Sequence, residues 1–133
     1  MSVLQGMPRC IAIVVCNEVI EDKRTNNKTL VGLFNQIAVN ALPSVHPRMF
    51  VLVSLTDLSG KAPVLIRISS ASKTVAEFPG ELATDDPRAV ADIVLELRGL
   101  PLEEAGAYRI DVLVHQVSIA DRYFHVVLQP AAG

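Results

Sequence analysis

The 133-residue sequence has no tryptophan, only two cysteines and few charged residues, and each shortage narrows the class of protein. Two cysteines cannot staple a chain of this length, so the fold depends on a packed core, and residues 1–133 are expected to form a single domain. Half of the residues are hydrophobic, which excludes intrinsic disorder. A net charge of −2 without a basic block argues against nucleic acid as a partner.

Long hydrophobic runs are absent as well, and no run approaches the roughly 18–20 residues that a membrane-spanning helix needs. The run Ile11–Cys16 is shorter than a secretory signal, and Val14 and Val15 stand where a lipoprotein signal ending at Cys16 needs a small residue. Within one extended strand, the Cα atoms of Cys10 and Cys16 would be about 20 Å apart, too far for a disulfide. Two free thiols predict a reducing, cytoplasmic location.

Short runs of Val and Ile, separated by Gly, Pro, Asn and Asp, are what the sequence has in abundance. This pattern is typical of β-strands, and no segment has convincing helical periodicity. Strands recurring about every 10 residues predict an all-β fold, an antiparallel sandwich of two sheets with seven to eight strands. The predicted strands are Cys10–Ile20, Thr29–Val39, Arg48–Leu58, Pro63–Ser70, Thr74–Phe78, Ala89–Leu97, Tyr108–Val114 and Ile119–Leu128.

Proline and glycine mark the predicted breaks between these strands. Pro43 and Pro47 lack the N–H group that a β-ladder uses, which predicts a loop over Asn40–Pro47. A glycine within a strand, such as Gly32, indicates a bulge or the close approach of another segment. A change of apolar parity in the last strand predicts a second bulge, near Ala120–Arg122. Further predicted breaks are Pro79-Gly80, the loop Glu81–Arg88 and the connection Gly99–Gly106.

The segment Glu104-Ala105-Gly106-Ala107-Tyr108-Arg109-Ile110 resembles the tyrosine corner of immunoglobulin-like sandwiches. In that motif a Tyr enters the penultimate strand and its hydroxyl bonds back to nearby backbone. The resemblance implies a structural role for Tyr108 and Gly106. Ile110 stands where antibody domains place their second cysteine and the chain has no Trp, so it is not an antibody-type domain.

A second resemblance extends over most of the chain, and five segments carry it. They are Cys16-Asn17-Glu18-Val19, Lys28-Thr29-Leu30-Val31-Gly32-Leu33-Phe34, Pro43-Ser44-Val45-His46-Pro47-Arg48, Gly106-Ala107-Tyr108-Arg109-Ile110 and Phe124-His125-Val126. Together they look like a family of small bacterial β-sandwich proteins of unknown function. The resemblance implies a compact cytoplasmic sandwich in a bacterium, and it supplies neither an activity nor catalytic residues.

The histidines are the most site-like side chains. His46 and Arg48 flank a proline in a predicted loop, where they could bind an anion or transfer a proton, although a rigid loop without a site is the simpler interpretation. His115 and His125 fall on the last two predicted strands, but a metal site needs a third ligand. Surface histidines are the simpler interpretation of this pair.

Calcium binding and catalysis have weaker support. Several carboxylates lie in predicted loops, but they are scattered, and ordinary solvated turns explain them. The sequence contains no nucleophile motif and no phosphate-binding loop, so it predicts no catalytic residue, no cofactor and no metal site. The loop carboxylates are Asp57, Asp85, Asp86, Glu103 and Glu104.

Three predicted segments, Cys10–Ile20, Arg48–Leu58 and Tyr123–Leu128, are apolar on both faces. An isolated two-layer sandwich leaves the outer face of each sheet in water, so such segments indicate additional cover from a partner. The favoured function is therefore a non-enzymatic protein-interaction module, a homodimer formed through an apolar sheet face or edge. The alternatives are a sandwich that binds calcium, lipid or another small ligand, and a small enzyme with a site near His46 and Arg48.

Overall fold

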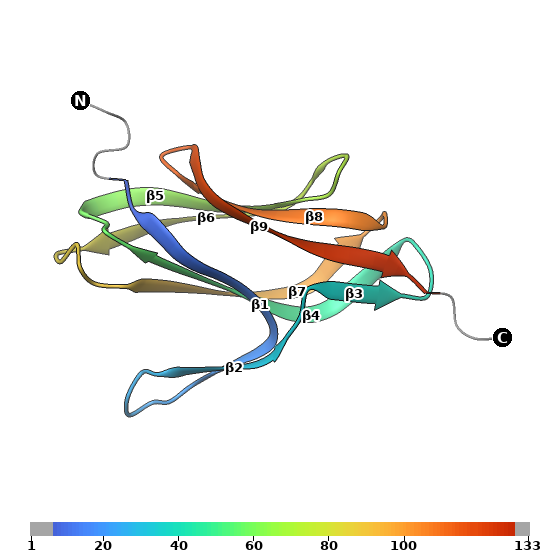
Figure 1. Cartoon of the computed structure of the whole chain (residues 1–133), viewed down its shortest axis with the longest axis horizontal. Helices are drawn as coiled ribbons and strands as arrows, with labels where there is room; N and C mark the ends of the chain where they lie inside the picture. The colour runs from blue at the N-terminus through green and yellow to red at the C-terminus, as the bar shows by residue number, and fades with distance from the viewer. Residues whose placement is uncertain (1–6, 130–133) are drawn as a thin grey trace.

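The computed structural model describes residues 7–129 as two β-sheets packed face to face (Figure 1). One sheet has four strands in the order β2-β1-β4-β7, and the other has five in the order β3-β9-β8-β5-β6. Residues 1–6 and 130–133 of the predicted single domain lie outside the described part. The strands are β1 (Arg9–Glu21), β2 (Lys28–Leu33), β3 (Gln36–Val39), β4 (Ser44–Thr56), β5 (Gly60–Ser69), β6 (Thr74–Thr84), β7 (Ala91–Leu102), β8 (Gly106–Val114) and β9 (Val117–Leu128).

The predicted all-β sandwich is confirmed, with nine strands instead of seven or eight. The difference arises because the predicted strand Thr29–Val39 is two strands in different sheets. Phe34 and Asn35 carry the chain from β2 across to β3, which pairs parallel to β9, while every other pairing is antiparallel. The described part of the chain contains no helix, and so none that could cross a membrane.

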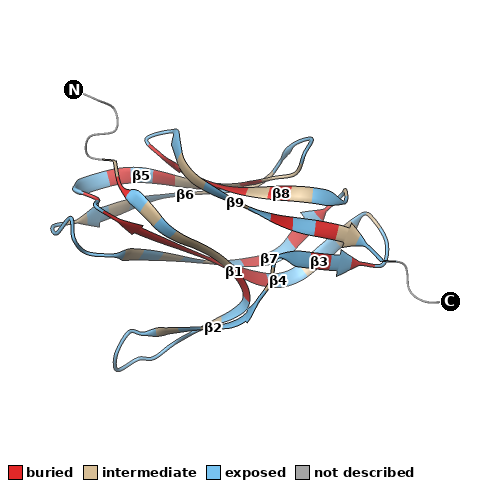
Figure 2. Cartoon of the chain, in the orientation of Figure 1, coloured by how far each residue is buried: buried red, intermediate tan, exposed pale blue. Residues whose placement is uncertain are grey.

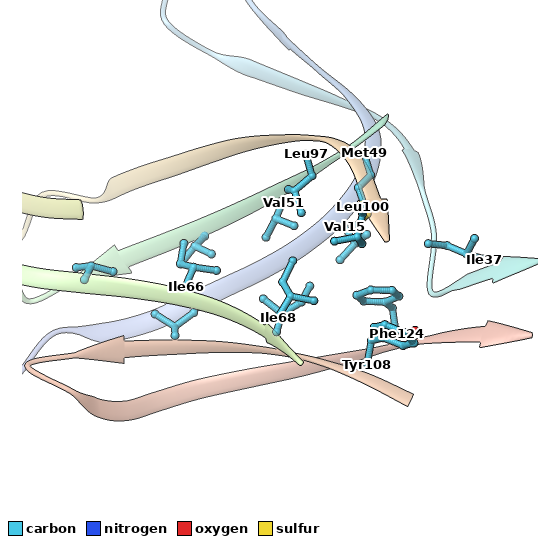
Figure 3. Packing of buried hydrophobic residues seen from close by; sticks show 14 of the residues in the cluster. Val15, Ile37, Met49, Val51, Ile66, Ile68, Leu97, Leu100, Tyr108 and Phe124 are labelled. Carbon is cyan, nitrogen blue, oxygen red and sulfur yellow. The ribbon is translucent and has the colours of Figure 1, made fainter. Parts of the chain in front are cut away.

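Alternating side chains of both sheets meet in a continuous core (Figure 3). Val15, Val51 and Leu97 come from the four-stranded sheet, and Ile66 and Ile68 from the facing one. At one end of the core the rings of Tyr108 and Phe124 stack with their centroids 5.3 Å apart. Burial of this apolar surface is the main contribution to stability, and it follows from the period-two pattern of the sequence.

Three predicted breaks are wrong because prolines lie inside strands. β4 begins at Ser44 and contains Pro47, β6 runs through Pro79, and β7 continues through Pro101. β6 and β7 are edge strands, in which a missing N–H group can face solvent without cost to the ladder. Pro47 has similar freedom, because β1 pairs with β4 only as far as Phe50. The predicted loops Asn40–Pro47 and Glu81–Arg88 and the connection Gly99–Gly106 shorten accordingly.

The structure contains both irregularities that the sequence predicts, one at Gly32 and one in the last strand. Gly32 has a φ of +70°, and a Cβ atom there would lie 2.3 Å from Nδ2 of Asn17, so the close approach of another segment is confirmed. In the last hairpin the pairing passes from Val112↔Ala120 to Leu113↔Ser118 and skips Ile119. This bulge lies one residue before the predicted position and accounts for the change of parity.

A hairpin projects from the four-stranded sheet (Figure 1). Beyond Cys16, β1 leaves β4 and pairs with β2 instead, and we call this hairpin, residues 17–33, the arm. Lys28 Nζ lies 3.5 Å from Asp92 Oδ2, so the face of the arm that carries Lys28 and Leu30 is turned toward the outer side of β7. The opposite face is open to solvent (Figure 2).

Candidate functional site

A groove of about 500 Å³ lies beside β3 and the start of β4. Its polar lining residues carry amide, hydroxyl and imidazole groups, and none of the described residues that line it is charged. This volume is within the range of known ligand pockets, about 300–1,000 Å³. The lining residues are Asn17, Phe34, Gln36, Ile37, Ala38, Val39, Asn40, Ser44, Val45, His46 and Pro47.

His46 lies in this groove, within strand β4 and not in the predicted loop. It pairs with Leu100, a buried core residue. Leu97 and Leu100 both face the core although they are three residues apart. Gly99, with a φ of +70°, lies between them and interrupts the alternation of inward and outward side chains along β7. The imidazole lies 6.0 Å from the Phe34 ring, between centroids.

Within the described residues, one nitrogen of the His46 imidazole lacks a hydrogen-bond partner. Its Nε2 atom is buried and has no hydrogen-bond partner there. Burial lowers the pKa of His46 below its usual value, so the ring is neutral at pH 7. A neutral imidazole can donate or accept a hydrogen bond, and the groove offers it no protein partner.

Arg48 does not join His46 in a common site. Its Nε lies 3.4 Å from Oε2 of Glu96, and its guanidinium lies over the Phe50 ring, 4.9 Å from the centroid. Glu96 also pairs with Arg98 at 2.8 Å, which places Arg48 in a charged cluster on the outer face of the sheet. The structure therefore separates the two side chains that the sequence placed in one loop.

The other two histidines are also apart. His115 lies in the turn between β8 and β9, with a φ of +49°, whereas His125 pairs with Ala107 toward the other end of that hairpin. At the usual rise of a strand, their backbones are separated by about 25 Å. Within residues 7–129, no three or more His, Cys, Asp and Glu side chains are grouped to hold a metal ion.

The loop carboxylates divide between the two ends of the sandwich. Asp57 lies 3.3 Å from Arg9, and its N–H donates to the carbonyl of Pro87, which places it beside the β6–β7 loop. At the other end, Glu104 accepts hydrogen bonds from the N–H and the hydroxyl of Ser72. Calcium needs several oxygen ligands converging on one point, and this division does not provide them.

Tyr108 is buried at the start of β8, and its hydroxyl donates a 2.8 Å hydrogen bond to the carbonyl of Glu104. The bond spans four residues, which is the geometry of a tyrosine corner. Gly106, at the beginning of β8, has a φ of +119°, a backbone conformation that other residues rarely adopt. Tyr108 and Gly106 therefore have a structural role in the turn from β7 into β8.

One exposed apolar feature, the outer side of the arm, was not predicted from the sequence. Ile20, Val31 and Leu33 expose 51%, 43% and 66% of their surface. The pairings Ile20↔Thr29, Glu18↔Val31 and Cys16↔Leu33 place these three side chains on one face, which we call the arm face. The apolar parity of Val31 and Leu33 was visible in the sequence, but the pairing that groups them with Ile20 was not.

The fold and the hydrogen bond of Tyr108 define an immunoglobulin-like β-sandwich of two sheets. The chain belongs to the family of unknown function DUF6941, whose sequence model matches residues 11–127. None of the curated proteins compared with the chain matches it.

The chain is similar to several solved structures at low sequence identity, and the first two of those below share its fold. The DNA glycosylase AlkC of Pseudomonas fluorescens is 13% identical over 90% of this chain and 30% of its own, with a TM-score of 0.52. A β-glucosidase of Listeria innocua is 11% identical over 90% of this chain and 16% of its own, with a TM-score of 0.50. An immunoglobulin-like protein of Pseudomonas aeruginosa is 14% identical over 90% of this chain and 96% of its own, with a TM-score of 0.47. The chain thus spans less than a third of the first two proteins.

Proposed function

We propose that this protein is a non-enzymatic interaction module that forms a homodimer through the arm. The observation that carries the proposal is the arm face, on which Ile20, Val31 and Leu33 are exposed beside the free edge of β2. Two identical edge strands can pair antiparallel about a two-fold axis, which joins two four-stranded sheets into one. The side chains of the two arm faces then lie side by side on the joined sheet.

The other sheet edges support this choice because each of them is less suited than β2 to pairing with a second copy of the chain. β6 carries Pro79, β7 carries Pro101 and the irregular Gly99, and β3 has only four residues. Proline, irregular backbone and short length are the usual means by which proteins protect an edge strand. β2 has no proline, and its one charged residue, Lys28, is engaged with Asp92 and Glu21 of the same chain.

The absence of enzymatic activity is part of the proposal. Among residues 7–129, His46 is the titratable side chain that lines the groove, and none of them supplies a second ionisable group there to act with it as acid, base or nucleophile. Burial raises the pKa of the thiols of Cys10 and Cys16, which makes both poor nucleophiles at pH 7.

We also infer a reducing, cytoplasmic setting and no nucleic-acid partner. Cys10 and Cys16 are free thiols in the chain, as expected where disulfides do not persist. Six arginine side chains lie within 4.0 Å of a carboxylate, so they are partly neutralised and leave little basic surface for phosphates. They are Arg9, Arg48, Arg67, Arg88, Arg98 and Arg109.

Light scattering after size exclusion tests the dimer directly. The natural chain is expected to have twice the monomer mass at micromolar concentration. Leu33→Asp is expected to be a monomer of unchanged fold, because a charge would replace an apolar side chain that contacts the partner's arm face. Val90→Asp is the matched control, since Val90 is 54% exposed but lies outside the arm, and it should remain dimeric. A natural chain that is monomeric at every concentration refutes the proposal.

A further inference from the structure

The groove beside His46 lies between two strand edges that have no partner among residues 7–129. β3 is the outermost strand of the five-stranded sheet, so one of its edges is free. β4 pairs with β1 only from Phe50 onward, so the part of β4 before Phe50 has a free edge on that side. β3 and β4 do not pair with each other, and residues of both line the groove.

The backbone of β3 presents hydrogen-bonding groups on its free edge. The carbonyls of Asn35 and Val39 accept hydrogen bonds from the N–H groups of His125 and Gln129 in the β9 segment. In a parallel pair, alternate residues of a strand make the bonds to the neighbour, so Asn35, Ile37 and Val39 face β9. The N–H and C=O groups of Gln36 and Ala38 therefore point away from β9, and both residues line the groove.

The side chains around these edges suit an uncharged, hydrogen-bonding ligand. Asn17, Gln36 and Asn40 offer amide groups that both donate and accept hydrogen bonds. An ionised ligand would meet no opposite charge in the lining, and its desolvation would be unfavourable. An extended peptide backbone presents the alternating donors and acceptors that a free strand edge requires.

We propose that this groove binds an extended, uncharged peptide segment of another protein, added as a strand along the free edge of β3. The main-chain groups of Gln36 and Ala38 bond the peptide backbone. The amide side chains bond its remaining polar groups, and the Phe34 ring contacts an apolar side chain. This site is separate from the arm face and does not depend on dimer formation.

The test uses a library of random heptapeptides displayed on phage, selected against the natural protein. Ala38→Pro removes one N–H group from the free edge without breaking a bond to β9, and Ala38→Ser is the matched control that keeps this group. The selected peptides are expected to be uncharged, to bind Ala38→Pro at least tenfold more weakly, and to bind Ala38→Ser as they bind the natural chain.

Hydrogen exchange gives a readout that does not depend on the folding of the proline variant. A selected peptide added to the natural protein is expected to slow amide exchange at Gln36 and Ala38. The proposal is overturned if no peptide is enriched, if the enriched peptides are charged, or if exchange at these two residues is unchanged. Binding on an array of neutral glycans in place of the peptides would also overturn it, because it would assign the groove to sugars.

Discussion

The outer faces of the two sheets differ in the side chains that they carry and in how those side chains interact. On the five-stranded sheet, Asp111 is only 5% exposed and lies in a charged network with Arg109 and Asp121, and it accepts a hydrogen bond from Ser118. On the four-stranded sheet, Phe50 and Leu52 are 7% and 8% exposed, although they point away from the core between the sheets. The first face is organised around ion pairs, whereas the second combines an apolar patch at Phe50 and Leu52 with the ion pairs of Glu96.

This difference shows where the chain has surface left for a partner. The charged face satisfies its own groups, since its arginines and carboxylates pair with each other. The four-stranded sheet continues into the arm, whose outer side exposes Leu33 beside an unprotected edge. An interface formed there removes exposed apolar surface from water, whereas an interface on the charged face would have to desolvate ion pairs.

The largest expected effect is on the apolar patch around Phe50, on the outer face of the four-stranded sheet. Phe50→Ala should lower the free energy of unfolding by about 3 kcal/mol, a loss typical of a core phenylalanine, because the ring is buried under its neighbours and the Arg48 guanidinium. Urea unfolding at a fixed protein concentration measures this loss. Tyr123→Ala, a half-exposed ring on the other sheet, is the control and should cost less than about 1 kcal/mol. Equal losses in the two variants would remove the contrast between the faces.

The charged face is tested by Asp111→Ala. We expect a loss of about 2 kcal/mol, because the Ser118 hydroxyl loses its acceptor and Arg109 loses one of its two carboxylates. Asp121→Asn should cost less than about 1 kcal/mol, since its ion pair with Arg109 is partly exposed to water. Both values come from the same urea experiment. A neutral or stabilising Asp111→Ala would show that the network does not hold this face together.

The arm is tested by Gly32→Ala, for which we expect a loss of about 1 kcal/mol from the positive φ alone. The added Cβ also meets the amide of Asn17, so the cost should fall when Asn17→Ala is combined with it. A double-mutant cycle measured by thermal unfolding separates the two contributions. Strict additivity would contradict the close approach at the base of the arm.

The smallest expected effect is a pH dependence from His46. Its pKa is lowered in the folded chain, so the unfolded chain binds more protons just below the ordinary histidine pKa of about 6.5. Stability should therefore fall as the pH drops through the unfolded-state pKa, and should level off below the folded-state pKa. Comparison of the natural chain with His46→Gln from pH 7 to pH 5 isolates this loss, and identical profiles would contradict it.

Much of the sandwich could be predicted from local sequence. Alternation of Val and Ile located strands such as β5 and β8, because a half-buried strand needs apolar residues at every second position. The prolines misled the prediction, since Pro47 and Pro79 were expected to lie outside the strands. Whether a proline ends a strand depends on which side of it has a neighbour, and that is a property of the whole sheet.

The groove could be predicted only in part. His46 was identified from its residue type, but its environment is built by β3, which sits in the other sheet after the chain crosses at Phe34. Contacts between strands of different sheets produce no regular pattern of residues along the sequence, so they could not be predicted from it. The arm face has the same origin, because it depends on the register that pairs Ile20 with Thr29.

Hydrogen exchange of the natural chain as a function of its concentration tests the central claim most directly, because it compares the edge strands of the two sheets in one experiment. As the concentration rises from nanomolar to high micromolar, we predict that amide exchange slows in β2 and stays unchanged in β6, whose edge carries Pro79. Slowing in β6 in place of β2, or no change in either strand, would contradict self-association through the arm.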